Sequence, residues 1–280
     1  MEVIRSIAEM TAVSQQMRKA GRTIVLVPTM GFFHEGHLQL MRFGRQHADQ
    51  LMVSLFVNPI QFGPNEDLQR YPRDFDRDVR LAEQERVDVM FVPDSREMYG
   101  ADFQTRIKVD QLSAPLCGRQ RPGHFDGVTT VVAKLFHIVR PHCSIFGEKD
   151  LQQLAVIRRM VDDLNFDVKI LGHPIVREPD GLAMSSRNSY LTAAERQSAL
   201  CLYKSLQLAR RMVSAGEGDV DRLRGEILKH VQSYPGVTVD YVAVVDQTSL
   251  QEKKRVDKSA IMAMAVRIGS TRLIDNGRLC

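Results

Sequence analysis

Short apolar runs alternate with stretches of helical periodicity over the first two thirds of the chain. The apolar runs have the length of buried strands and lie at Ile24–Val27, Leu51–Val57, Val87–Val92 and Cys143–Phe146. Between them, apolar positions recur every three or four residues, which predicts helices at Leu38–Phe43, from Pro72 through Ala82, at Val128–Val139 and at Leu151–Val161. Strands that alternate with helices indicate βαβ units, so we expect a Rossmann-like, doubly wound parallel sheet of the α/β class.

Three other parts of this region have weaker patterns. Apolar residues between 2 and 20 have helical spacing, which predicts a leading amphipathic helix. Residues 93–125 are rich in glycine, proline and charge, and we expect them to be irregular. Asp167–Leu171 and Pro174–Val176 are expected to be extended.

The pattern changes after Met184. Thr192 followed by Glu195 has the spacing of a capping box and predicts a long helix to about Ser214. A shorter helix at 220–233 and strands at Val237–Val245, Ala260–Ile268 and Thr271–Ile274 follow. We therefore predict two domains, residues 1–184 with the Rossmann-like layer and residues 185–280 as a smaller α+β domain.

Composition restricts the class of protein. The chain has 280 residues, of which 44% are apolar and 26% charged, as in ordinary globular proteins. Its four cysteines form no C-x-x-C pair, its first residues do not resemble a secretory signal, and no apolar run could cross a bilayer. We expect a cytoplasmic protein that does not bind a membrane.

The net charge of +4 could reflect an anionic substrate or a nucleic acid. The sequence contains no dense basic run and no tryptophan, which argues against a nucleic-acid-binding module. It also contains neither a P-loop nor a G-x-G-x-x-G fingerprint.

The most informative stretch is Pro28-Thr-Met-Gly-Phe-Phe-His34-Glu-Gly-His37, between the first predicted strand and its helix. Two imidazoles beside a helix N-terminus suit a phosphate chain, because the first N–H groups of a helix lack internal partners. One alternative is that His34 and His37 only cap the helix. A metal site is a second alternative, but the His-Glu-x-x-His motif of zinc proteases places its histidines at i and i+4, and here they lie at i and i+3.

This stretch resembles the His-x-Gly-His signature of the nucleotidyltransferase superfamily, and its longer form resembles the pantothenate synthetase family. Further stretches resemble that family in the same order: Phe56–Phe62, Arg121–Val128, Gly147–Gln153, Met184–Asn188 and Arg272–Asn276. The resemblance runs from about residue 22 to the C-terminus.

The resemblance implies an ATP-dependent ligase that condenses pantoate with β-alanine through pantoyl adenylate and releases AMP and pyrophosphate. The catalytic residues that it implies are His34, His37, Lys149, Ser185, Ser186 and Arg187. The implied ATP-binding residues are Met30, His37, Gly147, Lys149, Asp150, Val176, Met184, Ser185, Ser186 and Arg187, and the implied pantoate-binding residues are Met30, Asn58, Gln61 and Gln153. In this reading the first domain binds ATP and pantoate, and the second acts as a lid.

Several of these residues have a second interpretation. Asp150 could accept bonds from the ribose hydroxyls, cap a helix, or do both. Asn58 could hold its own loop or touch the substrate, Val176 could belong to the core, and the roles of Arg121 and His124 stay open.

The resemblance also implies Mg²⁺ that arrives with ATP, and a homodimer. We interpret Asp74, Asp76 and Asp78 as a solvated helix face and assign no protein ligand to the metal. The alternative function is a cytidylyltransferase-like enzyme that transfers a nucleotide to another small substrate. The Gln61 and Gln153 motifs argue against this alternative.

Overall fold

The computed structural model describes residues 1–64 and 66–280. The chain forms two compact units, and each is assembled from separate segments. The first contains Met1–Ser113, Arg121–Glu148 and Gln153–Pro174, and the second contains Ala114–Gln120, Lys149–Gln152 and Ile175–Cys280. The predicted functional division into 1–184 and 185–280 stays a prediction.

The first unit is built on a six-stranded sheet with the order β1-β4-β3-β2-β5-β6, in which all neighbouring strands are parallel. Its strands are β1 (Glu2–Ile4), β2 (Ile24–Thr29), β3 (Gln50–Leu55), β4 (Val89–Phe91), β5 (Cys143–Gly147) and β6 (Lys169–His173). The chain moves outward from β2 in one direction and from β5 in the other, so the strand order reverses between these two neighbours. Ligands bind beyond the carboxyl ends of the strands at such a point. This confirms the Rossmann-like prediction.

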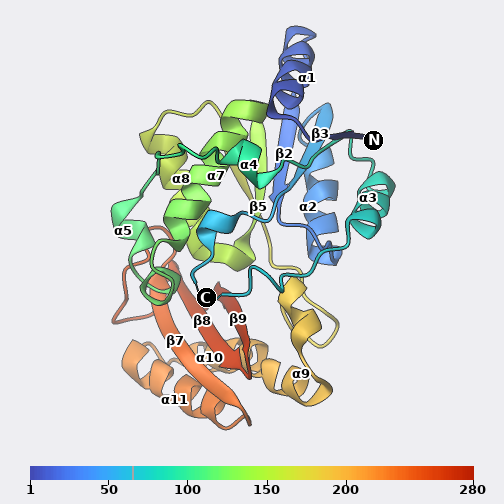
Figure 1. Ribbon diagram of the computed structural model, residues 1–280. Coiled ribbons are helices and arrows are strands. Elements are labelled where there is room, and N and C mark those ends of the chain that lie inside the picture. Colours follow the sequence, from blue (N-terminus) through green and yellow to red (C-terminus); the bar gives the residue numbers. More distant parts are fainter. Residues whose placement is uncertain (65) are drawn as a thin grey trace. The chain divides into compact units, whose positions relative to one another are not determined.

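Helices cover both faces of this sheet (Figure 1). They are α1 (Ile7–Lys19), α2 (Glu35–Arg45), α3 (Phe75–Gln84), α7 (His124–Val139) and α8 (Leu151–Asp163). Side chains of α2 and α3 form one buried cluster with alternate residues of the strands, including Val25, Val27 and Val53. α7 and α8 lie together on the other side of the sheet in Figure 1.

Three local predictions about residues 1–125 need correction. The first residues form β1, and α1 begins only after Ser6, because Glu2–Ile4 pair in register with Val89–Phe91. α3 begins at Phe75 rather than at Pro72, because Asp74 caps it by accepting a hydrogen bond from the Arg77 N–H. The region 93–125 contains three short helices, α4 (Ser95–Met98), α5 (Asp110–Ser113) and α6 (Cys117–Gln120). β6 ends at His173, and the expectation that Pro174–Val176 are extended stays a prediction.

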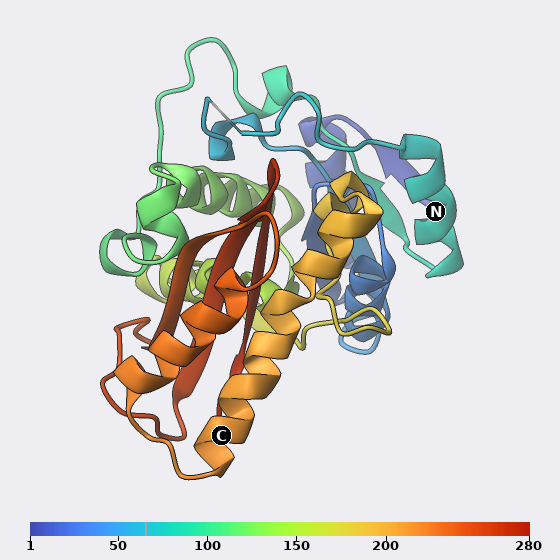
Figure 2. The same cartoon turned by 90° about the horizontal axis from the view of Figure 1, so that it is seen from below.

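The second unit contains an antiparallel sheet with the order β7-β8-β9, formed by Val237–Asp246, Ala260–Ile268 and Thr271–Arg278. Figure 2 shows α10 (Cys201–Ser214) and α11 (Val220–Gln232) lying along this sheet, and their buried side chains share one core with β7, β8 and β9. The predicted capping box is confirmed, since Thr192 and Glu195 exchange both of its hydrogen bonds at the start of α9 (Ala193–Ala199). The predicted long helix is interrupted at Leu200, which separates α9 from α10.

Among the described residues, no helix combines the length and the apolar character that a membrane span requires.

Candidate active site

The signature stretch joins β2 to α2 by a turn with left-handed backbone. Gly31 has φ +81° and Phe32 has φ +51°, after which His34 caps α2. His34 Nδ1 accepts the Gly36 N–H at 3.1 Å, and His37 Nδ1 accepts the His34 N–H at 3.3 Å. Because both Nδ1 atoms are acceptors, the proton of each neutral ring lies on Nε2, where it can be donated to a phosphate oxygen.

The two histidine rings lie together, with centroids 4.1 Å apart and planes inclined by 31°. Both histidines cap the helix through their Nδ1 atoms, as the first alternative suggested. For the metal alternative, within residues 1–64 and 66–280 no three His, Cys, Asp or Glu side chains are grouped so that they could hold a metal ion.

Asp78 on α3 contradicts the prediction of a solvated helix face. Its side chain is buried, with 1% exposure, and its two oxygens accept the N–H groups of Phe32 at 2.6 Å and Phe33 at 2.7 Å. Burial raises the pKa of this carboxyl, while the two backbone N–H groups oppose the rise. The sequence contained a signal for this position, since Asp78 lies three residues after Phe75 and four before Ala82, on the predicted apolar side.

Hydrogen bonds link Asn58 to Gln61 and Gln61 to Met30. Asn58 and Gln61 lie at the short helix η1 (Pro59–Gln61) after β3, and both are buried. Asn58 Nδ2 donates to Gln61 Oε1 at 3.0 Å, and Gln61 Nε2 contacts Met30 Sδ at 3.1 Å. The structure thus brings together three of the residues expected to bind pantoate.

The amide of Asn58 is fully engaged inside the protein. Its Nδ2 also donates to the Gly127 carbonyl at 3.0 Å, and its Oδ1 accepts from the Tyr99 hydroxyl at 2.7 Å. Burial raises the pKa of Tyr99, which keeps the phenol protonated as a donor. These contacts favour the loop-holding role for Asn58. Sequence reasoning missed Tyr99, which lies in the stretch expected to be irregular.

Arg121 and His124 hold the same loop by its backbone. Arg121 forms two 2.6 Å hydrogen bonds with Glu66, and its Nη1 lies 2.9 Å from His124 Nε2. Because the guanidinium can only donate, Nε2 accepts and His124 Nδ1–H donates to the Gln61 carbonyl at 2.8 Å. Burial pushes the pKa of Glu66 upward, but the hydrogen bonds and charge of Arg121 outweigh it and lower the pKa. Arg121 and His124 therefore hold the backbone of the loop that carries Gln61.

Lys149 lies in the second unit and is held by its backbone. It follows β5 in the short helix η2 (Glu148–Asp150), and its carbonyl accepts from Asn276 Nδ2 on β9 at 2.9 Å. The neighbouring Asp275 has a side chain that is only 1% exposed and accepts two hydrogen bonds from Arg177, at 2.7 and 2.9 Å. Sequence reasoning gave no role to Asp275, Asn276 or Arg177, although two of them lie in the quoted stretch Arg272–Asn276.

The segment from Val176 to Arg187 folds back on itself. The Met184 N–H donates to the Val176 carbonyl at 3.0 Å, and Arg177 bridges to Ala183. Ser185 caps η3 (Ser186–Tyr190), and its hydroxyl accepts the Arg187 N–H at 3.3 Å. Glu178, which sequence reasoning missed, accepts from Asn188 at 2.8 Å and from Arg196 at 2.7 Å.

The remaining predicted residues have fewer described contacts. Gly147 ends β5, and a Cβ built on it would meet nothing within 4 Å. Gln153 is half-buried in α8. Lys149 Nζ and Asp150 Oδ2 are 4.0 Å apart.

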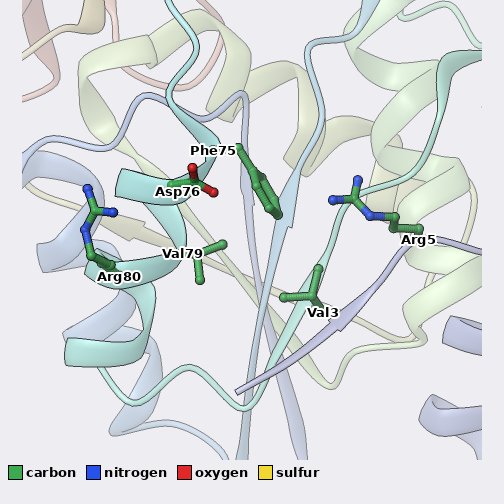
Figure 3. Close-up of a pocket in the computed structure, with 6 residues that line it drawn as sticks. All are labelled: Val3, Arg5, Phe75, Asp76, Val79 and Arg80. Carbon is green, nitrogen blue, oxygen red and sulfur yellow. The ribbon is translucent and has the colours of Figure 1, made fainter.

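The first unit also has a cleft of about 550 Å³ (Figure 3). It is lined by Val3, Arg5, Phe75, Asp76, Val79 and Arg80. In Figure 3 the guanidinium of Arg5 faces the Phe75 ring, and its carbon lies 4.9 Å from the ring centroid. None of the predicted site residues lines this cleft, so we assign no substrate to it.

Comparisons with known proteins agree over almost the whole chain. The family model described as pantoate-beta-alanine ligase matches residues 2–278. Curated relatives named pantothenate synthetase are similar in Geobacter sulfurreducens, at 55% identity over 99% of this chain and 98% of the relative, and in Thermotoga petrophila, at 53% over 99% of each.

Solved structures agree with this result. A pantothenate synthetase from Thermus thermophilus matches with a TM-score of 0.95 and 42% identity, covering 100% of this chain and 99% of that one. The pantoate-beta-alanine ligase from Francisella tularensis, complexed with Beta-gamma ATP and beta-alanine, matches with a TM-score of 0.82 and 31% identity, covering 100% and 98%.

Proposed function

We propose that this chain condenses pantoate with β-alanine to form pantothenate and consumes ATP in doing so, because the chain belongs to the pantoate-beta-alanine ligase family. The observation that carries this proposal is the match to relatives along nearly the full length of both chains. The same observation disfavours the cytidylyltransferase-like alternative, which requires a different acceptor.

In the first step, a pantoate carboxylate oxygen attacks the α-phosphorus of ATP. A bond forms between these atoms, the bond to the bridging oxygen breaks, and pyrophosphate leaves. In the second step the β-alanine amine attacks the acyl carbon, the carbon–oxygen bond to AMP breaks, and the amine loses a proton. Negative charge gathers on phosphate oxygens in the first step, so fixed donors and cations are the main means of lowering its barrier.

The phosphate chain is assigned to His34, His37, Lys149, Ser185, Ser186 and Arg187. The two imidazoles offer Nε2–H donors because their Nδ1 atoms accept backbone N–H groups. Lys149 supplies a compact cation, and Arg187 a planar fork of donors. Asp150 is assigned to the ribose, and Met30, Gly147, Val176 and Met184 complete the proposed ATP site.

Pantoate is assigned to Gln61, Gln153, Met30 and Asn58. Amides match hydroxyl and carboxylate groups because they both donate and accept. Gln61 Oε1 is engaged by Asn58, which leaves the two hydrogens of Nε2 to serve Met30 and a substrate oxygen. Asn58 contributes by holding this loop, and Met30 offers an apolar contact.

Mg²⁺ is proposed to arrive with ATP and to neutralise phosphate charge. The carboxylates of α3 do not form a protein cage for it, because Asp78 is occupied by backbone N–H groups and Asp74 caps the helix. Phosphate oxygens and water are the ligands that this ion prefers, so no side chain is assigned to it. A homodimer, which rests on the family resemblance, and a cytoplasmic location, which rests on the composition of the chain, are further parts of the proposal.

The proposal is tested by exchange of labelled pyrophosphate into ATP with β-alanine rigorously absent. Exchange should require pantoate and Mg²⁺ and should not occur without pantoate, because only the first step is reversed. A direct condensation of three bound substrates gives no exchange until β-alanine is added, and that result would refute the adenylate route. Absence of pantothenate formation with all substrates present would refute the function itself.

A further inference from the structure

We infer that Asp78 is a positioning residue for the nucleotide site, because its carboxylate fixes the turn that leads into His34 and α2. The inference rests on the proposed function, since it concerns what holds the histidines assigned to ATP. No substrate contact is assigned to Asp78 itself.

The first argument is the conformation of the turn. Phe32 has φ +51°, and the left-handed region is sterically unfavourable for a residue with a Cβ. Phe32 can hold this conformation only if surrounding contacts compensate its cost. The two hydrogen bonds from the Phe32 and Phe33 N–H groups to Asp78, at 2.6 and 2.7 Å, are charge-assisted and buried, which makes them strong enough for this purpose.

The second argument is the close fit between the turn and the carboxylate. A Cβ on Gly31 would lie 3.1 Å from Asp78 Oδ2 and 3.1 Å from Leu55 Cδ2. A side chain at position 31 would therefore push the backbone away from Asp78, in addition to disfavouring φ +81°. The turn and α3 are built to touch at this point.

The third argument concerns the charge of the ligand. Consecutive N–H groups in a left-handed turn form a concave anion-binding site. Here an internal anion, Asp78, already fills that site, so substrate phosphate is left to the histidines and to the N-terminus of α2. The geometry of those groups follows from the turn, because His34 is the residue after Phe33.

The effect should fall on ATP more than on pantoate. Met30, on the other side of Gly31, is held through Thr29, whose hydroxyl donates to the Ser54 carbonyl at 2.7 Å and accepts the Gly31 N–H at 3.3 Å. These contacts do not involve Asp78. Loss of the carboxylate should therefore displace the histidines while leaving Met30 and the Gln61 loop close to their places.

The test is Asp78→Asn, with Glu83→Gln as a matched control on the exposed side of the same helix. An amide of the same size keeps one acceptor but turns an NH₂ group toward the other backbone N–H. In pyrophosphate exchange, the KM for ATP should rise about tenfold while the KM for pantoate stays within about twofold. Glu83→Gln should leave both values unchanged.

Hydrogen exchange of the peptide 29–37, followed by mass spectrometry, gives a readout that needs no activity. Exchange should become faster in Asp78→Asn and stay as in the parent chain in Glu83→Gln, with α7 unchanged in both. Phe32→Gly added to Asp78→Asn should restore part of the ATP affinity, because glycine adopts the left-handed conformation without a steric cost.

An equal rise of both KM values, unchanged exchange in the peptide 29–37, or no recovery in the double variant would overturn the inference. If Asp78→Asn does not fold, recovery of folding by Phe32→Gly supports it and failure to recover contradicts it. Failure of the proposed function has a different signature, because the parent chain would then show no pantoate-dependent exchange while the hydrogen-exchange comparison would still report on Asp78.

Discussion

Lys149 shows how a single residue can be fixed by its backbone while its side chain stays partly exposed. Its carbonyl accepts from Asn276, and its side chain is 20% exposed. Lys149→Ala keeps the backbone contact, so we expect the melting temperature to be nearly unchanged. Adenylation should slow by roughly 10²–10³-fold, as is typical when one donor aimed at developing charge is removed.

Pyrophosphate exchange and thermal unfolding measure these two effects separately. Lys254→Ala, which removes an exposed lysine of the same unit, should change neither. A folded Lys149→Ala variant with near-normal exchange would exclude Lys149 from the phosphate site.

Residue identities could be predicted better than residue partners. The His-x-Gly-His stretch and the Thr192–Glu195 capping box were readable because their partners lie within three residues. The pairings of Asp78 with the signature turn and of Arg177 with Asp275 were not, because they span 45 and 98 residues or more. No local period encodes such a distance, and only the position of Asp78 on an apolar helix face indicated its burial.

At the scale of elements, η1 and α7 touch so closely that one of them must present a glycine. A Cβ on Gly127 would lie 2.5 Å from the Ile60 carbonyl oxygen and 2.6 Å from Gln61 Cα, both of which are backbone atoms. Gly127→Ala must therefore displace η1 and with it Gln61. We expect a loss of about 1–3 kcal/mol of unfolding free energy, as for other overpacked sites.

The same displacement should raise the KM for pantoate and leave the KM for ATP almost unchanged. Gly225→Ala is the matched control, since Gly225 lies inside α11 with nothing within 4 Å of the added Cβ. That change should stabilise the chain by about 0.5–1 kcal/mol. If the pantoate kinetics of Gly127→Ala are unaltered, the packing of α7 against η1 does not determine pantoate binding.

The periodic pattern identified most elements but not their ends. Strands β2 to β5 and helices α2, α7 and α8 lie where apolar spacing indicated them. β1 was missed because it has only three residues and its identity depends on pairing with β4, 87 positions away. The break at Leu200 was missed because apolar residues continue through it.

At the scale of the whole molecule, the segment after Ser185 is predicted to respond to nucleotide. Ser185, Ser186 and Arg187 are assigned to the β- and γ-phosphates, so ATP with Mg²⁺ should order residues 185–189. Trypsin cleavage after Arg187 should slow by a factor that approaches ~100 when ATP is present at about 100 times its Kd. Fragment masses would identify the site, and cleavage after the exposed Lys254 provides the internal reference.

Pantoate alone should give no protection. Equal rates of cleavage with and without ATP and Mg²⁺ would count against a phosphate-binding role for this segment.

The class of fold could be predicted from the sequence, because alternating strands and helices followed by helices and adjacent strands leave few arrangements. The sequence did not indicate which segments of the chain form the second unit. Ala114–Gln120 and Lys149–Gln152 belong to it through contacts with β7 and β9, and their local pattern resembles that of the loops around them.

Because the second unit is formed from three separate segments, its structure depends on both sides of a cut in the chain. A cut within residues 185–189 leaves Cys117, Lys149 and Arg177 on one fragment, and it leaves their partners Tyr241, Asn276 and Asp275 on the other. The two fragments would share these hydrogen bonds and the packing of Leu182 in the core of the second unit, without a covalent link, so we expect them to stay associated until denatured. Halves of the protein produced as separate chains would have to complement each other in trans, and neither could complete the second unit alone.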